Sequence, residues 1–280
     1  MPGFRDFITD EALCVNSIRC LFVNQACPTR QTKKNNRQEL TTLGSLLSWQ
    51  FIALYGTTSS QTIVLITASS YRTNATTSPS AAGRDITNAT AAAETLRALP
   101  NVQGRISLVQ LDVTNESSIA AAKTYIETTF SRLDILVNNV AISFLMSSMN
   151  LDILRTSFET NLVGVAAVTD SFLPLLRRST TPRLILVNSS NGSLTYNSDP
   201  DCPHGGTYAS EYRITKAALN MLLVRYHASL KDVTVLGVDP GFCATEAIGD
   251  TDALRRQGAA EPEVGGAVVA RVLHRLRLLC

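Results

Sequence analysis

Residues 133–141 of the chain read LDILVNNVA, a short run of branched apolar side chains that ends in two asparagines. Four other segments have the same form: 62–67 (TIVLIT), 106–113 (ISLVQLDV), 183–190 (RLILVNSS) and 234–239 (TVLGVD). Short, nearly continuous runs of Val, Ile and Leu are typical of strands that are buried on both faces of a sheet. We therefore predict that these segments are the strands of one buried sheet.

Helical patterns lie between the strands, at 86–99, 117–130, 151–178, 208–230 and 262–278. We expect Asn115 or Ser117 to cap the second helix and Pro174 to bend the third. Strands that alternate with helices imply right-handed crossovers and a parallel sheet with helices on both faces. The sequence thus predicts an α/β fold with a Rossmann-like three-layer parallel sheet, which binds ligands beyond the carboxyl ends of its strands.

The composition excludes several classes of function. The 280 residues are 45% hydrophobic with a formal net charge of +2, so no strong basic field would attract nucleic acid or an anionic membrane. The longest apolar stretch, 43–55, is too short to span a bilayer. Six cysteines without a C-x-x-C pair, together with three histidines, offer no good ligand set for zinc. We expect a cytoplasmic protein with reduced thiols and without metal, nucleic acid or membrane partners.

The character of the chain changes near residue 60. Residues 1–60 show no clean periodicity, and 29–42 are polar and basic (TRQTKKNNRQELTT). We expect residues 1–60 to be a poorly ordered N-terminal extension without an assigned role. Residues 61–280 are expected to form the Rossmann-like domain.

Tyr212 and Lys216 stand out among the polar residues that follow the strands. They lie four positions apart in a predicted helix and therefore share one face of it. The chain has only five lysines, and Tyr208, in the same helix, has no lysine four positions later. An ammonium group beside a phenol favours the phenolate and lowers its pKa from about 10, so we expect Tyr212 to act as an acid or base near neutral pH.

The chain from about residue 61 to residue 270 resembles the short-chain dehydrogenase/reductase family, particularly its fungal carbonyl-reductase-like members. The resemblance is carried by these motifs, in order along the chain: Asp112-Val113, Asn138-Asn139-Val140-Ala141, Phe158-Glu159-Thr160-Asn161, Ser189-Ser190, Tyr212-x-x-x-Lys216-Ala217-Ala218, and Asp239-Pro240-Gly241 with Thr245. Their order, spacing and strand context agree, which makes the set far more specific than any one motif.

This resemblance implies a catalytic set of Asn161, Ser190, Tyr212 and Lys216. Tyr212 would protonate the substrate oxygen as hydride arrives at the carbon, or deprotonate an alcohol in the reverse direction. Lys216 would lower the pKa of Tyr212 and hold the nicotinamide ribose. Ser190 would hydrogen-bond the substrate carbonyl. It is preferred to Ser189 because the family's serine is usually the second of such a pair, and Ser193 is a weaker candidate.

The resemblance also implies roles beside the cofactor. Asn161 would lie mid-helix and hold a water that relays protons to Lys216. The remaining residues would surround the dinucleotide, with Asp112 and Val113 at the adenine, Asn138 and Ala141 at the ribose, and Pro240, Gly241 and Thr245 over the nicotinamide, next to Tyr212 and Lys216.

One unit of the family's pattern is missing. The family's first strand is followed by Thr-Gly-x-x-x-Gly-x-Gly, whose glycines let the backbone approach the cofactor pyrophosphate at a helix N-terminus. Here TIVLIT is followed by the glycine-free segment 68–74 (ASSYRTN), and 75–82 (ATTSPSAA) fits neither the usual helix nor a second strand. The first βαβ unit is therefore incomplete. Either TIVLIT is the first strand and the next unit is deleted, or TIVLIT is the second strand and a segment within 43–55 replaces the first.

Arg84 follows the gap, in Gly83-Arg84-Asp85, where the family's second strand ends. An arginine here pairs with the 2′-phosphate of NADP in the family, which favours NADP over NAD. We therefore expect an NADP(H)-dependent oxidoreductase that reduces a ketone or aldehyde of a small organic molecule, or oxidises the alcohol. The missing glycines leave open an alternative, a non-catalytic relic of the family that lacks dinucleotide binding.

Two further features are expected from the resemblance. Substrate choice would lie in the loops 194–206 and 247–257, which follow strands of the sheet. Two copies of the chain would form a homo-oligomer through the long helices that carry Asn161 and Tyr212.

Overall fold

The computed structural model describes residues 22–23, 53–57, 60–67, 94, 107–144, 150–201, 208–245 and 250–275. The glycine-free segment 68–74 and Arg84 lie outside the described residues, as does the predicted helix 86–99 apart from Glu94, which is helical.

Four parallel strands form the centre of the sheet: β3 (Ser60–Thr67), β5 (Ile135–Asn138), β6 (Arg183–Val187) and β7 (Thr234–Val238). They pair in that order, and the last residues of β3 and β5, Thr67 and Asn138, are partners in the register. Every residue of β5 and β6 is buried. Because both faces of these strands are covered, their sequences show continuous apolar runs rather than alternation.

Three further strands complete the sheet in the order β1-β7-β6-β5-β3-β2-β4. β1 (Phe22–Val23) runs parallel to β7, β2 (Ala53–Thr57) antiparallel to β3, and β4 (Ser107–Leu108) antiparallel to β2. TIVLIT pairs directly with β5 and so occupies the position of the first strand in this topology. This agrees with the first of the two alternatives, in which TIVLIT is the first strand.

The prediction of a wholly parallel sheet is wrong for one strand, β2. Only residues 58 and 59 separate β2 from β3. A connection of two residues can join antiparallel neighbours, whereas a parallel crossover needs about a dozen or more. β2 and β1 also show that part of the segment 1–60 joins the sheet. The division of the chain at residue 60 stays a prediction.

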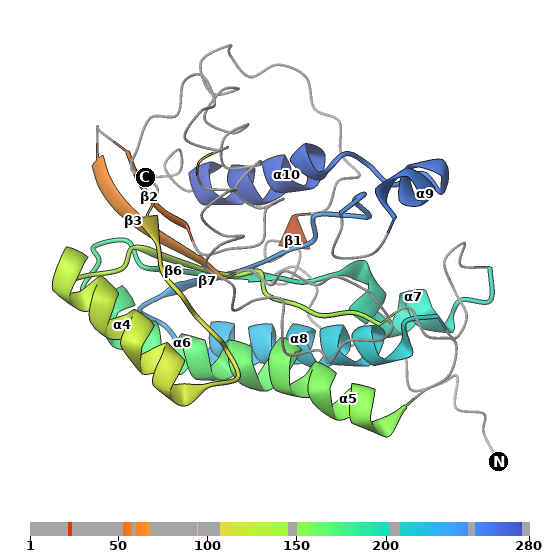
Figure 1. Ribbon diagram of the computed structural model, residues 1–280, viewed down its shortest axis with the longest axis horizontal. Coiled ribbons are helices and arrows are strands. Elements are labelled where there is room, and N and C mark those ends of the chain that lie inside the picture. Colours follow the sequence, from red (N-terminus) through yellow and green to blue (C-terminus); the bar gives the residue numbers. More distant parts are fainter. Residues whose placement is uncertain are drawn as a thin grey trace, which may run out of the picture.

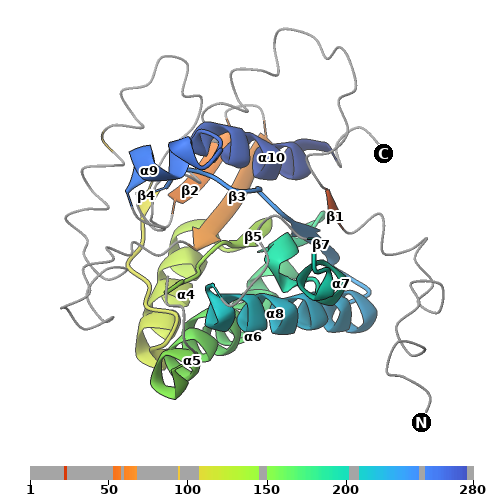
Figure 2. The same ribbon diagram turned by 90° about the vertical axis from the view of Figure 1, so that its right-hand side faces the viewer.

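Helices cover both faces of the sheet, as Figures 1 and 2 show. On one face lie α4 (Glu116–Phe130), α6 (Gly164–Leu176) and α8 (Ser210–Ser229), and on the other lies α10 (Pro262–Arg275). Phe172 of α6 and Leu223 of α8 are fully buried in the core beneath these helices. The predicted α/β fold class with three layers is therefore confirmed.

The strand predicted at 106–113 is shorter than expected. β4 ends at Leu108, where its pairing with β2 ends. Beyond it the Asp112 carboxylate accepts hydrogen bonds from the backbone N–H and the hydroxyl of Thr114, at 3.0 and 2.7 Å, and turns the chain. Asn115 then caps α4 by accepting from the N–H of Ser118, so of the two predicted caps Asn115 is confirmed.

The long helix predicted at 151–178 is present but changes its winding in the middle. It consists of α5 (Leu151–Phe158), the π-helical turn η3 (Glu159–Val163) and α6. The departure from α-helical hydrogen bonding lies at η3, whereas Pro174, the predicted bend, lies within α6. A π-turn inside a helix frequently marks a functional position.

Gly164 is the position where α6 passes over the turn after β4. A Cβ atom at Gly164 would lie 2.7 Å from Cγ2 and 2.8 Å from the carbonyl oxygen of Val113. We expect Gly164→Ala to destabilise the protein by about 1–3 kcal/mol, because the backbone of Val113 cannot yield like a flexible side chain. Thermal unfolding of the two proteins measures this. A higher melting temperature for the variant, as helix propensity alone would give, would contradict the close contact.

Candidate active site

The carboxyl ends of the parallel strands meet at one edge of the sheet, where polar side chains hold the loops together. The hydroxyl of Thr67, at the end of β3, accepts from the N–H groups of Asn139 and Val140 at 3.2 and 3.4 Å. The loop after β5 is thereby fixed against the end of β3. The sequence-predicted residues Asn138, Ala141, Ser190, Pro240 and Gly241 all lie on or just after strands at this edge.

Lys216 is buried at this edge, although it carries an ammonium group. Its side chain is on α8 and the residue is only 2% exposed. Nζ donates a hydrogen bond of 2.7 Å to the carbonyl oxygen of Val187, the last residue of β6. Nζ also lies 5.5 Å from the ring centroid of Tyr212, one helical turn away. The predicted pairing of Tyr212 with Lys216 on one helix face is thus present.

The pKa values of this pair differ from the simple expectation. Burial lowers the pKa of Lys216 to about 8, although the nearby Asp239 carboxylate acts to raise it. The pKa of Tyr212 is raised to about 12, mainly by burial; the Asp239 carboxylate acts in the same direction, and a hydrogen bond with Ser189 acts to lower it. The ammonium group was predicted to lower the phenol's pKa, but desolvation of the phenolate outweighs that effect here.

Ser189, and not Ser190, is the serine that contacts Tyr212. The Ser189 side chain hydrogen-bonds with Tyr212 and also accepts from the N–H of Asn191 at 3.2 Å. Ser190 is exposed and begins the 3₁₀ turn η4 (Ser190–Gly192). The choice of Ser190 as the serine that binds the substrate carbonyl stays a prediction, while the structure brings Ser189 to Tyr212. β6 ends at Val187, so the chain turns earlier than the predicted strand 183–190 would have it.

Gly192 explains how the turn η4 packs so closely against α8. A Cβ atom at Gly192 would lie 2.5 Å from the carbonyl carbon and 2.6 Å from the carbonyl oxygen of Lys216. Only glycine permits this contact between two backbones. The approach brings the turn that follows Ser189 onto the helix of Tyr212 and Lys216.

Asn161 lies in the π-turn η3 and is fully buried. Its Oδ1 accepts from the N–H of Ile142 at 2.7 Å, and its Nδ2 donates to the carbonyl oxygen of Ile142 at 2.9 Å and to Oγ1 of Thr215 at 3.0 Å. The side chain therefore joins the loop after β5 to α8, next to Lys216. The structure gives the Asn161 side chain this joining role; the predicted water relay to Lys216 stays a prediction.

The residues predicted at the adenine and ribose occupy two different environments. Val113 is buried in the core under Gly164, and Asp112 shapes the turn after β4. Asn138 is buried, and its Nδ2 donates to Oγ1 of Thr169 at 2.9 Å. Its Oδ1 has no hydrogen-bond partner among the described residues. Ala141 is half-buried in the loop that follows.

The residues predicted at the nicotinamide follow β7. Gly241 adopts φ 81°, a left-handed conformation that favours glycine, and the carbonyl oxygen of Pro240 accepts from Sγ of Cys243 at 3.7 Å. Thr245 donates its N–H to the carbonyl oxygen of Cys243 at 3.0 Å. These three residues form one compact turn beside Asp239.

Sequence reasoning missed the roles of Asp239 and Arg213. Asp239 appeared only as part of a motif, yet its carboxylate accepts from the N–H of Ser190 at 2.7 Å and from that of Gly241 at 2.8 Å. A carboxylate immediately after a buried strand and before Pro-Gly was the available signal. Arg213 is buried, and its Nη1 donates to Oδ1 of Asn197 at 2.6 Å while its Nε donates to the carbonyl oxygen of Tyr208 at 2.9 Å.

The Arg213 contacts hold one of the two predicted substrate loops. Asn197 lies in α7 (Leu194–Ser198), and its Nδ2 donates to the carbonyl oxygens of Asn191 and Ser193, at 2.7 Å each. The guanidinium group of Arg213, on α8, thus stabilises the segment that follows Ser189. This stabilising contact belongs to no catalytic motif, and the sequence therefore gave no signal for it.

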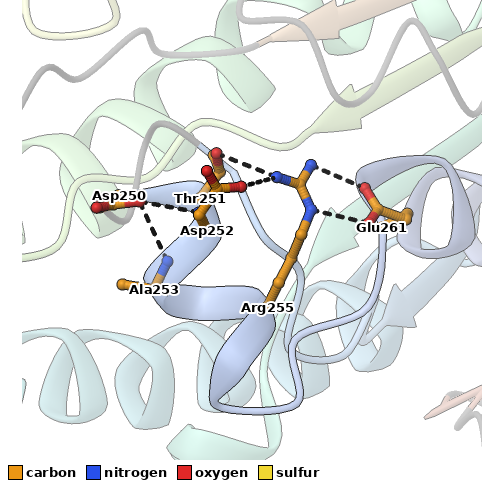
Figure 3. Close-up of polar contacts among 6 residues, drawn as sticks. All are labelled: Asp250, Thr251, Asp252, Ala253, Arg255 and Glu261. Carbon is orange, nitrogen blue, oxygen red and sulfur yellow. Dashed lines mark hydrogen bonds and ion pairs between the residues drawn. The ribbon is translucent and has the colours of Figure 1, made fainter.

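The second predicted substrate loop contains α9 (Thr251–Arg256). Figure 3 shows that Arg255 of α9 binds Glu261 with two nitrogens, at 2.8 and 3.0 Å, and Asp252 at 2.8 Å. Asp250 caps the helix by accepting from the N–H groups of Asp252 and Ala253. The contact between Arg255 and Glu261 ties α9 to the start of α10.

The described residues fit the nicotinamide half of a dinucleotide. An ammonium group has three N–H donors, and one of those of Lys216 binds Val187, so the other two can reach a ribose. The turn of Pro240 and Gly241 follows β7, and the buried Oδ1 of Asn138 lies at the end of β5. The segment that would hold the pyrophosphate, 68–74, lies outside the described residues.

None of the described helices is long and apolar enough to cross a membrane. In the same part of the chain no group of three or more His, Cys, Asp or Glu side chains could hold a metal ion.

Comparisons with known proteins identify one family along this part of the chain. A family model described as short chain dehydrogenase matches residues 80–255. The short-chain dehydrogenase/reductase tropE of Talaromyces stipitatus is 32% identical over 193 residues, which cover 64% of this chain and 73% of that protein.

Two solved structures have a similar fold. Salutaridine reductase from Papaver somniferum has a TM-score of 0.55 at 24% identity, covering 68% of this chain and 84% of its own. An alcohol dehydrogenase from the archaeon Thermococcus sibiricus, complexed with 5-hydroxy-NADP, has a TM-score of 0.56 at 19% identity, covering 68% and 77%. At these identities the likeness concerns the fold alone.

The buried Lys216 predicts how stability changes with pH. Its pKa is lowered to about 8 in the folded protein from 10.5. Between these values the unfolded lysine keeps a proton that the folded one has lost, so stability rises with pH. We expect the free energy of unfolding of the wild type, relative to Lys216→Met, to increase from pH about 7 to pH about 9.5.

Urea denaturation of both proteins at the two pH values measures this difference. The pH stays below 10 because Tyr212, whose pKa is raised to about 12, contributes with the opposite sign above its ordinary value of 10. Lys216→Arg, which stays charged at both pH values, serves as a second reference and should give the same trend. A difference that does not depend on pH would contradict the burial of a lysine that loses its proton on folding.

Proposed function

The chain belongs to the short-chain dehydrogenase/reductase family, and from that membership we propose that it is an NADP(H)-dependent oxidoreductase that reduces a ketone or aldehyde of a small organic molecule. The observation that carries the proposal is the cluster of Tyr212, Ser189 and Lys216 at the carboxyl edge of the sheet. The family consists of oxidoreductases that act on alcohol and carbonyl groups with nicotinamide dinucleotides.

Tyr212 is proposed as the proton donor. A bound nicotinamide dinucleotide supplies the hydride to the carbonyl carbon. The hydroxyl of Tyr212 gives its proton to the carbonyl oxygen, and the raised pKa of about 12 means that this proton is present at neutral pH.

Ser189 takes the role that the sequence assigned to Ser190. Its hydroxyl lies beside that of Tyr212, so both can hydrogen-bond one carbonyl oxygen. Lys216 is proposed to hold the ribose of the cofactor with the N–H groups that do not bind Val187. Asn161 hydrogen-bonds both α8 and the loop that follows β5, and so holds Lys216 and Tyr212 in place relative to that loop.

The preference for NADP rests on Arg84, whose guanidinium group would pair with the 2′-phosphate. A cytoplasmic location and pairing of two copies through the long helices of Asn161 and Tyr212 remain part of the proposal.

A relic without dinucleotide binding is the second candidate, favoured by the absence of glycine between Thr67 and Arg84 except at Gly83. Titration of the protein with NADPH, followed by cofactor fluorescence, separates the two. A micromolar dissociation constant supports the enzyme, and no binding at millimolar NADPH supports the relic.

Tyr212→Phe tests the proton donor. We expect kcat for NADPH-dependent reduction of phenanthrenequinone, a reactive diketone probe, to fall about 10²–10⁴-fold because the general acid is removed. NADPH affinity and melting temperature should stay close to those of the wild type. Tyr208→Phe removes a hydroxyl from the tyrosine four positions earlier, just before α8, and serves as the matched control. Retention of most activity in Tyr212→Phe would refute the mechanism.

Arg84→Ala tests the cofactor preference. A charged hydrogen bond contributes about 1.5–3 kcal/mol, so NADPH should bind roughly tenfold to a hundredfold more weakly while NADH affinity is unchanged. Fluorescence titration with both cofactors measures this. Arg177→Ala, which removes a guanidinium paired with Asp232 at the opposite edge of the sheet, is the control. Equal weakening for NADPH and NADH would count against a 2′-phosphate contact.

A further inference from the structure

Asp239 continues the pairing of two strands beyond their last backbone hydrogen bond. The ladder between β6 and β7 ends where Asn188 donates its N–H to the carbonyl oxygen of Val238 at 2.8 Å. Past this point the Asp239 carboxylate acts as the acceptor. Its Oδ2 accepts from the N–H of Ser190 at 2.7 Å and its Oδ1 from the N–H of Gly241 at 2.8 Å. Hydrogen bonds to an ionised acceptor are stronger than neutral ones.

The two N–H groups belong to loops with different tasks in the proposed reaction. Ser190 directly follows Ser189, which lies beside the Tyr212 hydroxyl. Gly241 belongs to the turn proposed to lie over the nicotinamide, and its N–H donates to the carboxylate. The Asp239 side chain therefore sets the distance between the substrate side and the cofactor side of the site.

We propose that Asp239 is a positioning residue for carbonyl reduction, because its carboxylate joins the loop of Ser189 to the loop of Pro240 and Gly241. This inference rests on the proposed function and extends it to a residue for which the family resemblance gave no role. Alignment of donor, carbonyl and cofactor is required for the reaction, and a misplacement of about 1 Å can reduce the rate about 100-fold.

The charge of Asp239 supports the same role. Of the ionisable groups around it, Tyr212 and Lys216 face it from α8 and Cys243 from its own loop, and Glu263 of α10 acts on Cys243 in turn. Asp239 raises the pKa values of both Tyr212 and Lys216, in each case as the largest influence after burial. Its negative charge therefore favours the neutral phenol and the ammonium group, which is the protonation state that can donate to a carbonyl.

Two substitutions separate the charge of Asp239 from its geometry. Asp239→Asn keeps the size, but the amide removes the charge and turns one acceptor into a donor that faces an N–H group. Asp239→Glu keeps the charge but lengthens the side chain. Asp134→Asn is the matched control, because Asp134 is also a buried carboxylate that accepts from a backbone N–H, that of Ile63 at 2.7 Å, at the opposite edge of the sheet.

Two readouts are measured for each protein. The first is the pH profile of kcat for NADPH-dependent reduction of phenanthrenequinone. The second is the titration midpoint of Lys216, followed by NMR of ¹³C-labelled lysine, which is practical because the chain has five lysines. The Lys216 signal is assigned with Lys216→Met and does not depend on turnover.

For Asp239→Asn we expect kcat to fall roughly tenfold or more, and both the pH profile and the Lys216 midpoint, about 8 in the wild type, to move to lower pH. Asp239→Glu should keep the midpoint but still lose turnover. Asp134→Asn should lower the melting temperature and leave the midpoint and the pH profile unchanged.

The results distinguish failure of this inference from failure of the proposed function. Wild-type turnover combined with an unchanged pH profile and midpoint in Asp239→Asn would overturn the role of Asp239 while the enzyme activity stands. Wild-type kcat in Asp239→Glu would overturn the geometric part. If the wild type reduces no carbonyl compound, the proposed function fails. A shifted Lys216 midpoint in Asp239→Asn would then still support the placement of the carboxylate beside the pair.

Discussion

The hydrogen bond from the buried ammonium group of Lys216 to the carbonyl oxygen of Val187 joins helix α8 to the end of strand β6. Burying a charged lysine is costly unless its N–H groups find acceptors, so this bond constrains where α8 can lie. The contact of Gly192 with the backbone of Lys216 allows the helix to approach closely enough to make it. Tyr212, one turn earlier, is placed at the strand ends as a consequence.

Side chains, rather than backbone pairing, hold the loops at this edge of the sheet. Thr67 fixes the loop after β5, Asn161 joins that loop to α8, and Asp239 joins the loops after β6 and β7. Backbone ladders end where parallel strands diverge into their loops, so each further contact needs a polar side chain. In the proposed function the same groups that stabilise the loops would also define the position of a bound substrate and cofactor.

The sheet accommodates an unusual start of the chain. β2 lies beside β3 in an antiparallel hairpin, and β1 is added at the far edge next to β7. The central strands β3, β5, β6 and β7 keep their parallel order, and these are the strands whose carboxyl ends form the candidate site. The half of the site that carries Tyr212 and Lys216 is thus built on the central strands, whichever segments of the chain form the outer ones.

The sequence by itself determined the central strands, most helices, and the pairing of Tyr212 with Lys216, because apolar runs and the four-residue helical spacing are local properties. Three features were decided only by the tertiary structure. Ser189 contacts Tyr212, β2 is antiparallel, and the Asp239 carboxylate joins two loops. The contacts of Ser189 and Asp239 join segments distant in the chain, whereas the orientation of β2 follows from its short connection to β3. The burial of Tyr212 also results from tertiary packing. It raised the pKa of Tyr212, whereas the neighbouring ammonium group of Lys216 alone had predicted a decrease.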